Sequence, residues 1–226
     1  MSPKTKTLLK SVLYSLLSIA SITMASPSLA AAIDLSTSDT LGDAITSSSQ
    51  ATITNAVPDG RDDATNYNVS GKAPEQFLVN LETSLGLNAG TLGLDATEGS
   101  AIALKLLGLQ RGDVLSFNSD FKIYDTINLD RAFVSIRNTT NIDPAQAVIR
   151  QLASGISSFS YTFADAGDYN IGIGVLDVDD TSFSSELKVS DARLTPVPEP
   201  ITILGSATAL GFGAVMRRRF SKKVEE

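Results

Sequence analysis

The sequence predicts a mainly β domain, a β-sandwich of the jelly-roll type with one or two short helices, between residues 31 and 196 of the 226-residue chain. Three observations lead to this prediction. Short runs of alternating apolar and polar residues recur at roughly 8–12-residue spacing. Gly, Asp and Asn bound these runs, as they bound the strands of sandwiches. Segments with helical periodicity are few. A stretch of about 165 residues is long enough for one such domain with its own core.

The predicted strands share one pattern, in which residues of one parity are apolar. The clearest runs are 51–54, 102–106, 115–123, 159–163 and 169–175. In the run 169–175, the odd-numbered residues are apolar and the even-numbered residues are Asn170, Gly172 and Gly174. Such a strand packs one face in the core and leaves a nearly bare backbone on the other. We therefore expect close approach there by a neighbouring strand, a loop or a ligand.

One amphipathic helix is predicted at 74–86. Pro74 suits a first helical turn, leucines recur on one face, and Gly86 suits the end. The segment 143–155 has similar punctuation, but its apolar run fits a strand equally well, so both interpretations stay open.

The chain begins with the pattern of an export signal. Three lysines within the first ten residues precede an apolar run at 12–24, and small residues suited to cleavage follow near residue 30 or 32. The apolar run is too short and too rich in serine for a membrane anchor. We expect residues 1–30 to be a signal peptide.

The C-terminal segment, 197–226, has three parts. A short extended motif comes first, formed by Val197, Pro198, Glu199 and Pro200. The apolar run 201–216 follows and reaches about 24 Å as a helix, so it spans the roughly 30 Å hydrocarbon core only with snorkelling by flanking side chains. The basic tail 217–226 contains Arg217, Arg218 and Arg219, which favour a cytoplasmic location. The domain at 31–196 is then expected outside the inner membrane.

This tail resembles that of PEP-CTERM proteins, which bacteria with an exopolysaccharide-rich envelope export. The resemblance implies a single-pass membrane intermediate, cleavage by an exosortase-type processing enzyme near Pro198-Glu199-Pro200, and delivery to the outer surface or extracellular matrix. The alternative is an ordinary tail anchor whose prolines end a linker.

The blocks 112–117 and 174–180 also resemble a domain common among passengers of this family, for which no activity is implied. Many members have a Trp between the two phenylalanines of the first block's strand. Here Asn118-Ser119-Asp120 stands between Phe117 and Phe121.

Composition narrows the chemistry. Residues 31–196 carry 22 acidic and 10 basic residues, a net charge of −12, whereas basic residues at both ends bring the whole chain to −7. Such a domain repels nucleic acid and attracts cations such as calcium, so we expect no nucleic-acid partner. The chain has no Cys, His or Trp, which excludes thiol nucleophiles, Ser-His-Asp catalysis and the usual zinc sites. Carboxylate chemistry, calcium binding or no catalysis remains.

Two groups of carboxylates are candidate calcium ligands. Asp177, Asp179 and Asp180 form the densest cluster, and a solvated turn is the alternative. Asp191 shares its parity with two apolar residues, so a regular strand points it at the core. Either calcium satisfies this carboxylate, as in jelly-roll carbohydrate-binding modules, or a bulge near Ser190 turns it outward.

For a sugar ligand, an aromatic platform is the usual requirement. Tyr161 and Tyr169 have core parity, so Tyr124 is the better candidate, and an ordinary exposed tyrosine is the alternative. No pair of carboxylates is fixed at a separation useful for glycoside hydrolysis. The sequence thus predicts an exported, non-catalytic protein with a structural or adhesive role in exopolysaccharide. The alternatives are a carbohydrate-binding module with a defined sugar site and, last, a carboxylate-dependent glycan-active enzyme.

Overall fold

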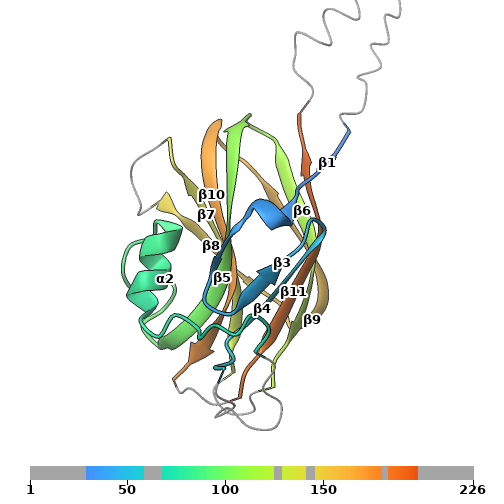
Figure 1. Ribbon diagram of the computed structural model, residues 1–226. Coiled ribbons are helices and arrows are strands. Elements are labelled where there is room, and N and C mark those ends of the chain that lie inside the picture. The colour runs from blue at the N-terminus through green and yellow to red at the C-terminus, as the bar shows by residue number, and fades with distance from the viewer. Residues whose placement is uncertain (1–28, 59–67, 125–128, 141–145, 180–182, 198–226) are drawn as a thin grey trace, which may run out of the picture. The chain divides into compact units, whose positions relative to one another are not determined.

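The alternating segments form two antiparallel sheets that face each other (Figure 1). The computed structural model describes residues 29–58, 68–124, 129–140, 146–179 and 183–197. Within these residues the larger sheet has six strands, with the order β3-β4-β11-β6-β9 and β1 paired to β11. Its strands are β1 (Ala31–Ala32), β3 (Ala44–Thr46), β4 (Gln50–Thr54), β6 (Val114–Lys122), β9 (Gly155–Thr162) and β11 (Glu186–Thr195).

The second sheet has five strands in the described part of the chain, in the order β2-β5-β10-β7-β8. These are β2 (Asp39–Leu41), β5 (Ala96–Leu109), β7 (Arg131–Asn138), β8 (Val148–Leu152) and β10 (Gly167–Val178). From β4 onward the chain crosses between the sheets at every connection except that from β7 to β8. The predicted mainly β, two-sheet fold is confirmed.

The space between the sheets is filled by the inward-facing apolar residues of both. The most deeply buried members of this core include Ile53, Leu115 and Phe121 from the six-stranded sheet and Ile102, Ile136, Ile171 and Ile173 from the five-stranded sheet. Each such side chain contributes about 1.5–3 kcal/mol by leaving water. The aromatic residues of the predicted strand 159–163 pack here, and the rings of Phe117 and Phe159 stack with centroids 4.7 Å apart.

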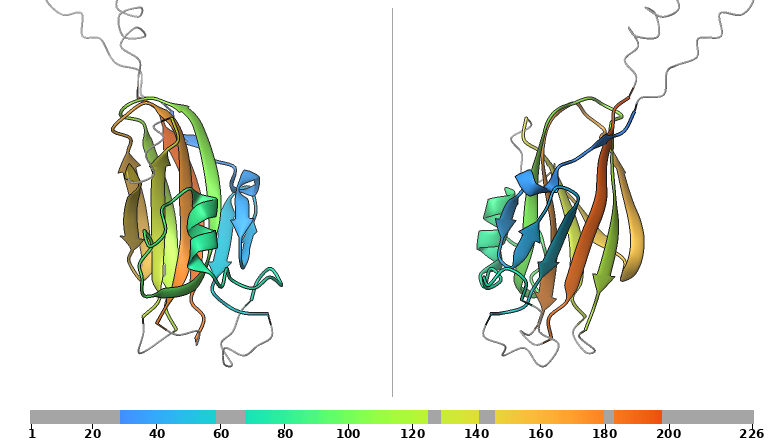
Figure 2. Two further views of the ribbon diagram at one scale, coloured as in Figure 1. Left: turned by 90° about the vertical axis from the view of Figure 1, so that its left-hand side faces the viewer. Right: turned by 45° about the vertical axis from the view of Figure 1, so that its right-hand side comes forward.

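A helix covers the outer face of the five-stranded sheet (Figure 2). Helix α2 (Leu78–Leu85) ends at Gly86, whose φ of 74° is the left-handed conformation that favours glycine. Its leucines pack in a second apolar cluster with Ala101, Phe133 and Leu176 of the sheet. A Cβ on Gly172 would lie 2.7 Å from a methyl group of Leu85. The bare face predicted for 169–175 is therefore the seat of this helix.

The remaining predictions for the elements have mixed outcomes. The helix predicted at 74–86 is confirmed at Leu78–Leu85, with Phe77 as its N-cap residue. In the ambiguous segment the strand interpretation is correct, because β8 occupies Val148–Leu152, and the helical alternative is wrong. A 3-10 helix, η1 (Leu35–Thr37), was not anticipated, and the Asp34 carboxylate caps it by accepting from Ser36 N at 3.0 Å.

Apart from residues 29, 30 and 197, the targeting segments lie outside the described residues. Residues 1–28 and 198–226 contain the rest of the predicted signal peptide, the Pro-Glu-Pro step, the apolar run 201–216 and Arg217 to Arg219. Among the described residues, no helix has the length and apolar character needed to cross a bilayer. Ser28–Val197 forms a compact unit of its own and contains both apolar clusters and all strands of the described residues.

Candidate binding groove

The outer faces of the two sheets differ in character. Helix α2 covers the five-stranded sheet, whereas the outward residues of β6, β9 and β11 are exposed or half-buried. They alternate with buried residues in β6 and in most of β11, and with half-buried residues in β9. These outward positions carry mostly Ser, Thr, Asn, Asp, Glu and Lys. The six-stranded sheet therefore offers a broad polar surface.

A groove of about 610 Å³ lies on this surface. Strand register explains its lining. Ser190 pairs with Gln50 on one side and Asn118 on the other, and Asn118 pairs with Ser158. One step along, Lys188 pairs with Asp120, which pairs with Ile156. The complete lining is Gln50, Asn118, Ser119, Asp120, Ile156, Ser157, Ser158, Lys188 and Ser190.

The groove offers hydrogen-bond groups of every kind and lacks a ring for stacking. Hydroxyls, amides, a carboxylate and an ammonium group belong to its lining residues, whereas the hydroxyl of the buried Ser119 is already bonded to that of Ser157 at 2.8 Å. Asn118 to Asp120, which stand between Phe117 and Phe121, belong to its lining. A ligand held here is bound by polar contacts to hydroxyl or amide groups rather than by an aromatic platform.

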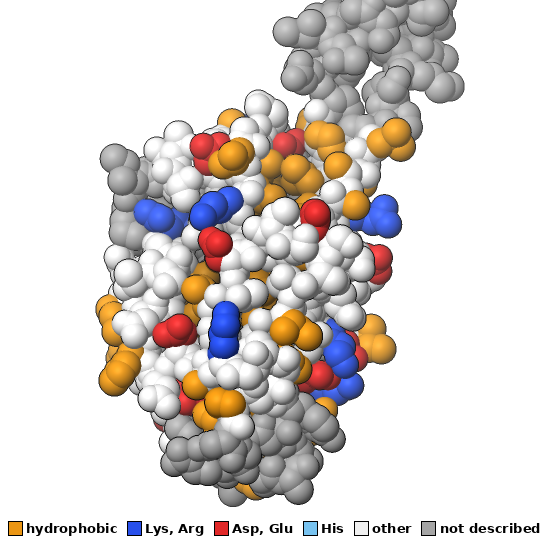
Figure 3. Space-filling model, viewed as in Figure 1, with side chains coloured by type: hydrophobic (Ala, Val, Ile, Leu, Met, Phe, Trp, Pro, Cys, Tyr) orange, Lys and Arg blue, Asp and Glu red, His pale blue; other side chains and the backbone are white. Residues whose placement is uncertain are grey.

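Both signs of charge meet beside the groove. Lys188 Nζ lies 3.0 Å and Lys122 Nζ 3.5 Å from Glu186 Oε1. The charge of Glu186, and then its hydrogen bond, raise the pKa of Lys122 above its ordinary value. Figure 3 shows basic and acidic side chains interleaved on the side of the molecule where β11 and β9 lie. Positive and negative charges are therefore mixed on this surface.

Asp191 borders the groove at a β-bulge. The register between β11 and β6 shifts between Ser190 and Arg193, and Asp191 takes a φ of 54° and is exposed. The predicted bulge is confirmed, because it turns the carboxylate outward and lets Ala192 become buried. Asn118 Nδ2 donates to Asp191 Oδ2 at 3.0 Å. Asp191 therefore orients an amide of the groove, and calcium at this position stays a prediction.

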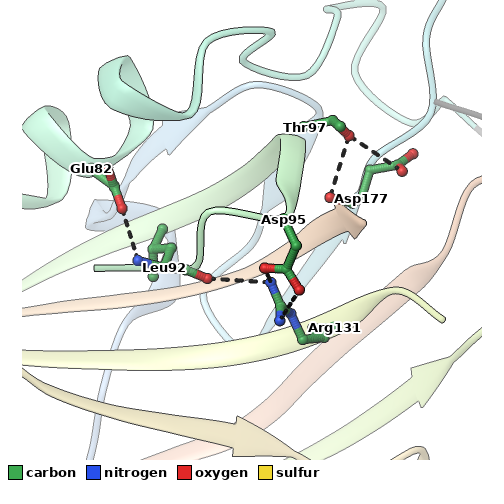
Figure 4. Close-up of polar contacts among 6 residues, drawn as sticks. All are labelled: Glu82, Leu92, Asp95, Thr97, Arg131 and Asp177. Atoms are coloured by element: carbon green, nitrogen blue, oxygen red, sulfur yellow. Dashed lines mark hydrogen bonds and ion pairs between the residues drawn. The ribbon is translucent and has the colours of Figure 1, made fainter. Parts of the chain in front are cut away.

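The acidic cluster at the end of β10 does not act as one group. Asp177 is buried and accepts hydrogen bonds from Thr97 and from Asn55 Nδ2, the latter at 3.3 Å. The same Asn55 amide donates to the buried Asp130 at 2.9 Å. Figure 4 shows Thr97 meeting Asp177. Two distant segments thus bring Asn55 and Asp130 to Asp177, which sequence spacing could not indicate.

Asp179 points away from that buried group. It is exposed with a φ of 61°, and its N–H donates to the carbonyl of Asp95 at 2.8 Å. Asp180 lies outside the described residues. Within the described ranges, no three carboxylates gather closely enough to hold a metal ion. A calcium site at Asp177, Asp179 and Asp180 remains a prediction.

A second, smaller cavity of about 170 Å³ has two tyrosines in its wall. Tyr161 is half-buried and Tyr169 buried, and the Tyr169 hydroxyl donates to the carbonyl of Asp165 at 2.8 Å. Burial raises the pKa of the Tyr161 hydroxyl above its ordinary value. Both rings pack on the core as predicted. Residue parity did not indicate that the two tyrosines also line a cavity with Asn138, Gln146 and Asp165.

The other predicted residues lie elsewhere. Tyr124 follows the end of β6, is half-buried and lines neither cavity. Val197 is described, and its N–H donates to the buried carboxylate of Asp113 at 2.9 Å. Pro198, Glu199, Pro200 and Arg217 to Arg219 fall outside the described residues.

A further polar group, unforeseen from the sequence, has a structural role. Arg131 forms a two-pronged ion pair with Asp95 at 2.7 and 2.9 Å and reaches the carbonyl of Leu92. Glu82 of α2 accepts from the N–H of Leu92 at 2.8 Å (Figure 4). It also accepts from the N–H of Gly90 at 2.8 Å. These contacts fasten the loop that follows α2 to the sheet. They serve the fold and lie on the side opposite the groove.

Comparison with known proteins gives no family. No family model matches the sequence, and no curated protein matches it. Among solved structures, a carbohydrate-binding module complexed with β-1,4-galactotriose matches at TM-score 0.33 and 7% identity, over 46% of this chain and 67% of that one. The N-terminal cellulose-binding domain of Cellulomonas fimi β-1,4-glucanase C matches at 0.34 and 11%, over 72% and 90%. The enzymatically active domain of bacteriophage CBA120 tailspike protein 4 matches at 0.37 and 10%, over 76% of this chain and 21% of that chain. All these TM-scores lie below 0.5, so they assign the chain to no family.

Proposed function

We propose that this chain is an exported, non-catalytic protein that adheres to hydrated polysaccharide through the groove on its six-stranded sheet. The observation that supports this most is the groove itself, which runs across β4, β11, β6 and β9 and presents only polar groups and one isoleucine. Polysaccharides offer dense arrays of hydroxyl groups, which such a lining can bind. The open form of the groove suits an internal stretch of polymer rather than a chain end.

The location of the protein belongs to the same proposal. The export signal and the resemblance to PEP-CTERM tails support delivery to the outer surface or matrix, after processing by an exosortase-type enzyme. An extracellular site is where an exopolysaccharide partner occurs. The strong acidity of the domain favours uncharged or cation-bridged polymer over anionic polymer alone.

A defined sugar site is the second candidate, and the cavity of about 170 Å³ favours it. Its wall combines two tyrosines with the polar residues Asn138, Gln146 and Asp165, a composition that suits a sugar pocket. Its volume fits at most a single ring, so it is the site of choice for a short, defined oligosaccharide end. The two candidates therefore differ in ligand length.

Binding of the Ser28–Val197 unit to the producer's exopolysaccharide, measured with calcium and with chelator, tests the proposal. We expect retention that falls at least about tenfold in Asn118→Ala/Asp120→Ala, because about 1.4 kcal/mol of polar contact energy is lost. Tyr161→Leu, which keeps an apolar side chain, should leave retention unchanged. If Tyr161→Leu reduces retention, Asn118→Ala/Asp120→Ala does not, and a short oligosaccharide saturates binding, then the sugar site is the small cavity.

The chelator arm decides the role of calcium. Retention that needs calcium makes Asp191 and Asp179 the next substitutions. Retention that ignores it removes calcium from the proposal. No retention either with calcium or with chelator would contradict the proposed binding of polysaccharide.

A further inference from the structure

Strand β9 is an unprotected edge of the six-stranded sheet. The other strands with an open side in the described part of the chain are short or charged: β1 has two residues, β2 and β3 have three each, and β8 has five and carries the exposed Arg150. By contrast, β9 has eight residues without charge, proline or a shift in its register with β6. Short length, charge, proline and bulges are the usual defences of an edge against pairing with another chain.

The backbone groups on the open side of β9 can be assigned. Phe163 N–H donates to the carbonyl of Asp113 at 2.9 Å, and its own carbonyl accepts from Gly112 at 2.8 Å. This contact continues the register in which Thr162 pairs with Val114. Because alternate residues of a strand direct their polar groups to opposite sides, the odd-numbered residues of β9 bond to β6. The N–H and C=O groups of Ile156, Ser158, Ser160 and Thr162 therefore face the open edge, where no described residue bonds to them.

We propose that β9 pairs in antiparallel fashion with β9 of a second copy of this chain, joining two six-stranded sheets across a two-fold axis. The strand complements itself, because in an antiparallel pair even-numbered residues of one copy meet even-numbered residues of the other. The facing side chains are small or apolar, and Ile156 is 87% exposed in the single chain. Residues 151–164 carry no charge, so two domains of net charge −12 can approach along this strand with the least repulsion.

The pairing has a consequence for the groove. Ile156, Ser157 and Ser158 of β9 form one end of its lining. A two-fold axis beside β9 and normal to the sheet keeps the outer faces of both copies on the same side. The two grooves then meet across the axis as one longer polar trough. The dimer itself does not depend on polysaccharide binding, so each proposal can fail alone.

The first test is the oligomeric state of the Ser28–Val197 unit, measured by sedimentation over a range of concentrations. Ser160→Pro removes an N–H that faces the open edge and breaks no bond to β6, so the fold should persist while two intermolecular hydrogen bonds are lost. We expect a dimer whose dissociation constant rises at least about tenfold in this variant. Ser158→Lys should act in the same direction by placing like charges across the axis.

The matched control is Ser49→Lys, an exposed serine in the turn before β4 near the opposite edge of the sheet. It adds the same charge and should leave the dissociation constant unchanged. Thermal unfolding of each variant checks that the domain is folded. A wild-type unit that stays monomeric at every concentration overturns the proposal. So does a dissociation constant that rises as much in Ser49→Lys as in Ser158→Lys.

The second test is disulfide cross-linking of the full chain in its natural location. The chain has no cysteine, so only introduced cysteines can form a disulfide within the dimer. The variant for this test is Ser158→Cys/Ser160→Cys. If the two-fold axis passes at residue 158, position 158 of one copy faces position 158 of the other. If it passes at residue 159, position 158 faces position 160. Opposed residues of antiparallel strands lie about 4.5–5.5 Å apart, within reach of a disulfide. We expect a disulfide-linked dimer, and none from Ser47→Cys/Ser49→Cys. A disulfide to a different protein would assign the edge to another partner and overturn pairing with a second copy.

Discussion

At the scale of single residues, Asp113 has the most consequential contacts. Its buried carboxylate accepts from Gln110 N at 2.8 Å and from Val197 N at 2.9 Å, so it fixes the backbone one residue before Pro198. Asp113→Ala leaves both N–H groups without this partner and should cost about 1–3 kcal/mol in the free energy of unfolding, measured with urea. It should also increase proteolysis near residue 197. Asp39→Ala, which removes an exposed carboxylate paired with Lys105, should cost less than about 1 kcal/mol. Equal losses in the two variants would contradict the role of Asp113.

A pH dependence follows from Asp95. The hydrogen bond from Arg131 lowers the pKa of Asp95 below its ordinary value of 3.8. Its contribution to stability is therefore complete above pH 3.8 and is lost as the pH falls through the lowered pKa. Asp95→Asn should reduce stability at pH 6 and should lose less stability than the wild type between pH 5 and pH 2.5, measured by urea unfolding. An identical pH profile in both proteins would show that the ion pair is not maintained in solution.

Residue parity predicted some positions correctly and misled at others for a definable reason. It gave the bulge at Asp191 as one of two alternatives, with calcium as the other, and it gave the core packing of Tyr169, because both depend on neighbours along the same strand. It treated Asp177 and Asp179 as one group, although the end of β10 buries the first and exposes the second. The partners of Asp177 are Thr97 of β5 and Asn55, which follows β4 of the other sheet, and no local pattern identifies them.

At the scale of elements, the seat of α2 is set by Gly172. A side chain there would meet Leu85 and Ser135, so Gly172→Ala should destabilise the domain by about 1–3 kcal/mol despite the usual advantage of alanine in a strand. Adding Leu85→Ala removes one of the colliding groups. The Gly172→Ala substitution should then cost less in the Leu85→Ala background, as a double-mutant cycle of unfolding free energies measures. Strictly additive losses would contradict direct packing of Leu85 on Gly172.

The sequence predicted where strands and the helix lie better than it predicted what covers them. Alternation at 169–175 indicated a face open to close approach, but a strand, a loop and a ligand were equally compatible with it. Only the pairing of β10 with β5 and β7 places Gly172 under α2. The groove was missed for the same reason, because Gln50, Asn118, Ser158 and Ser190 become neighbours only through the register of four strands.

At the scale of the whole molecule, the two ends of the domain lie together. Ala31 and Ala32 of β1 pair with Leu194 and Arg193 of β11, so the chain enters and leaves the sandwich at the same end (Figure 1). The groove lies instead on the face of the sheet, across the middle of β11. A domain tethered by this end can therefore keep the groove accessible to polymer.

The sorting hypothesis makes the last prediction. If a processing enzyme reads the Pro-Glu-Pro step, Pro198→Ala/Pro200→Ala should leave a longer, membrane-retained form, because the segment no longer holds an extended backbone. Immunoblots of membrane, surface and medium fractions measure this. Lys222→Ala/Lys223→Ala keeps the motif and Arg217 to Arg219 and should be processed like the wild type. The Ser28–Val197 unit should unfold at an unchanged temperature in both variants, since all strands of the described residues lie within it. Normal release of the proline variant would show that the processing enzyme does not read the Pro-Glu-Pro step. Membrane retention of the wild type and the variant alike would favour the ordinary tail anchor, and the proposed groove would then be judged on binding alone.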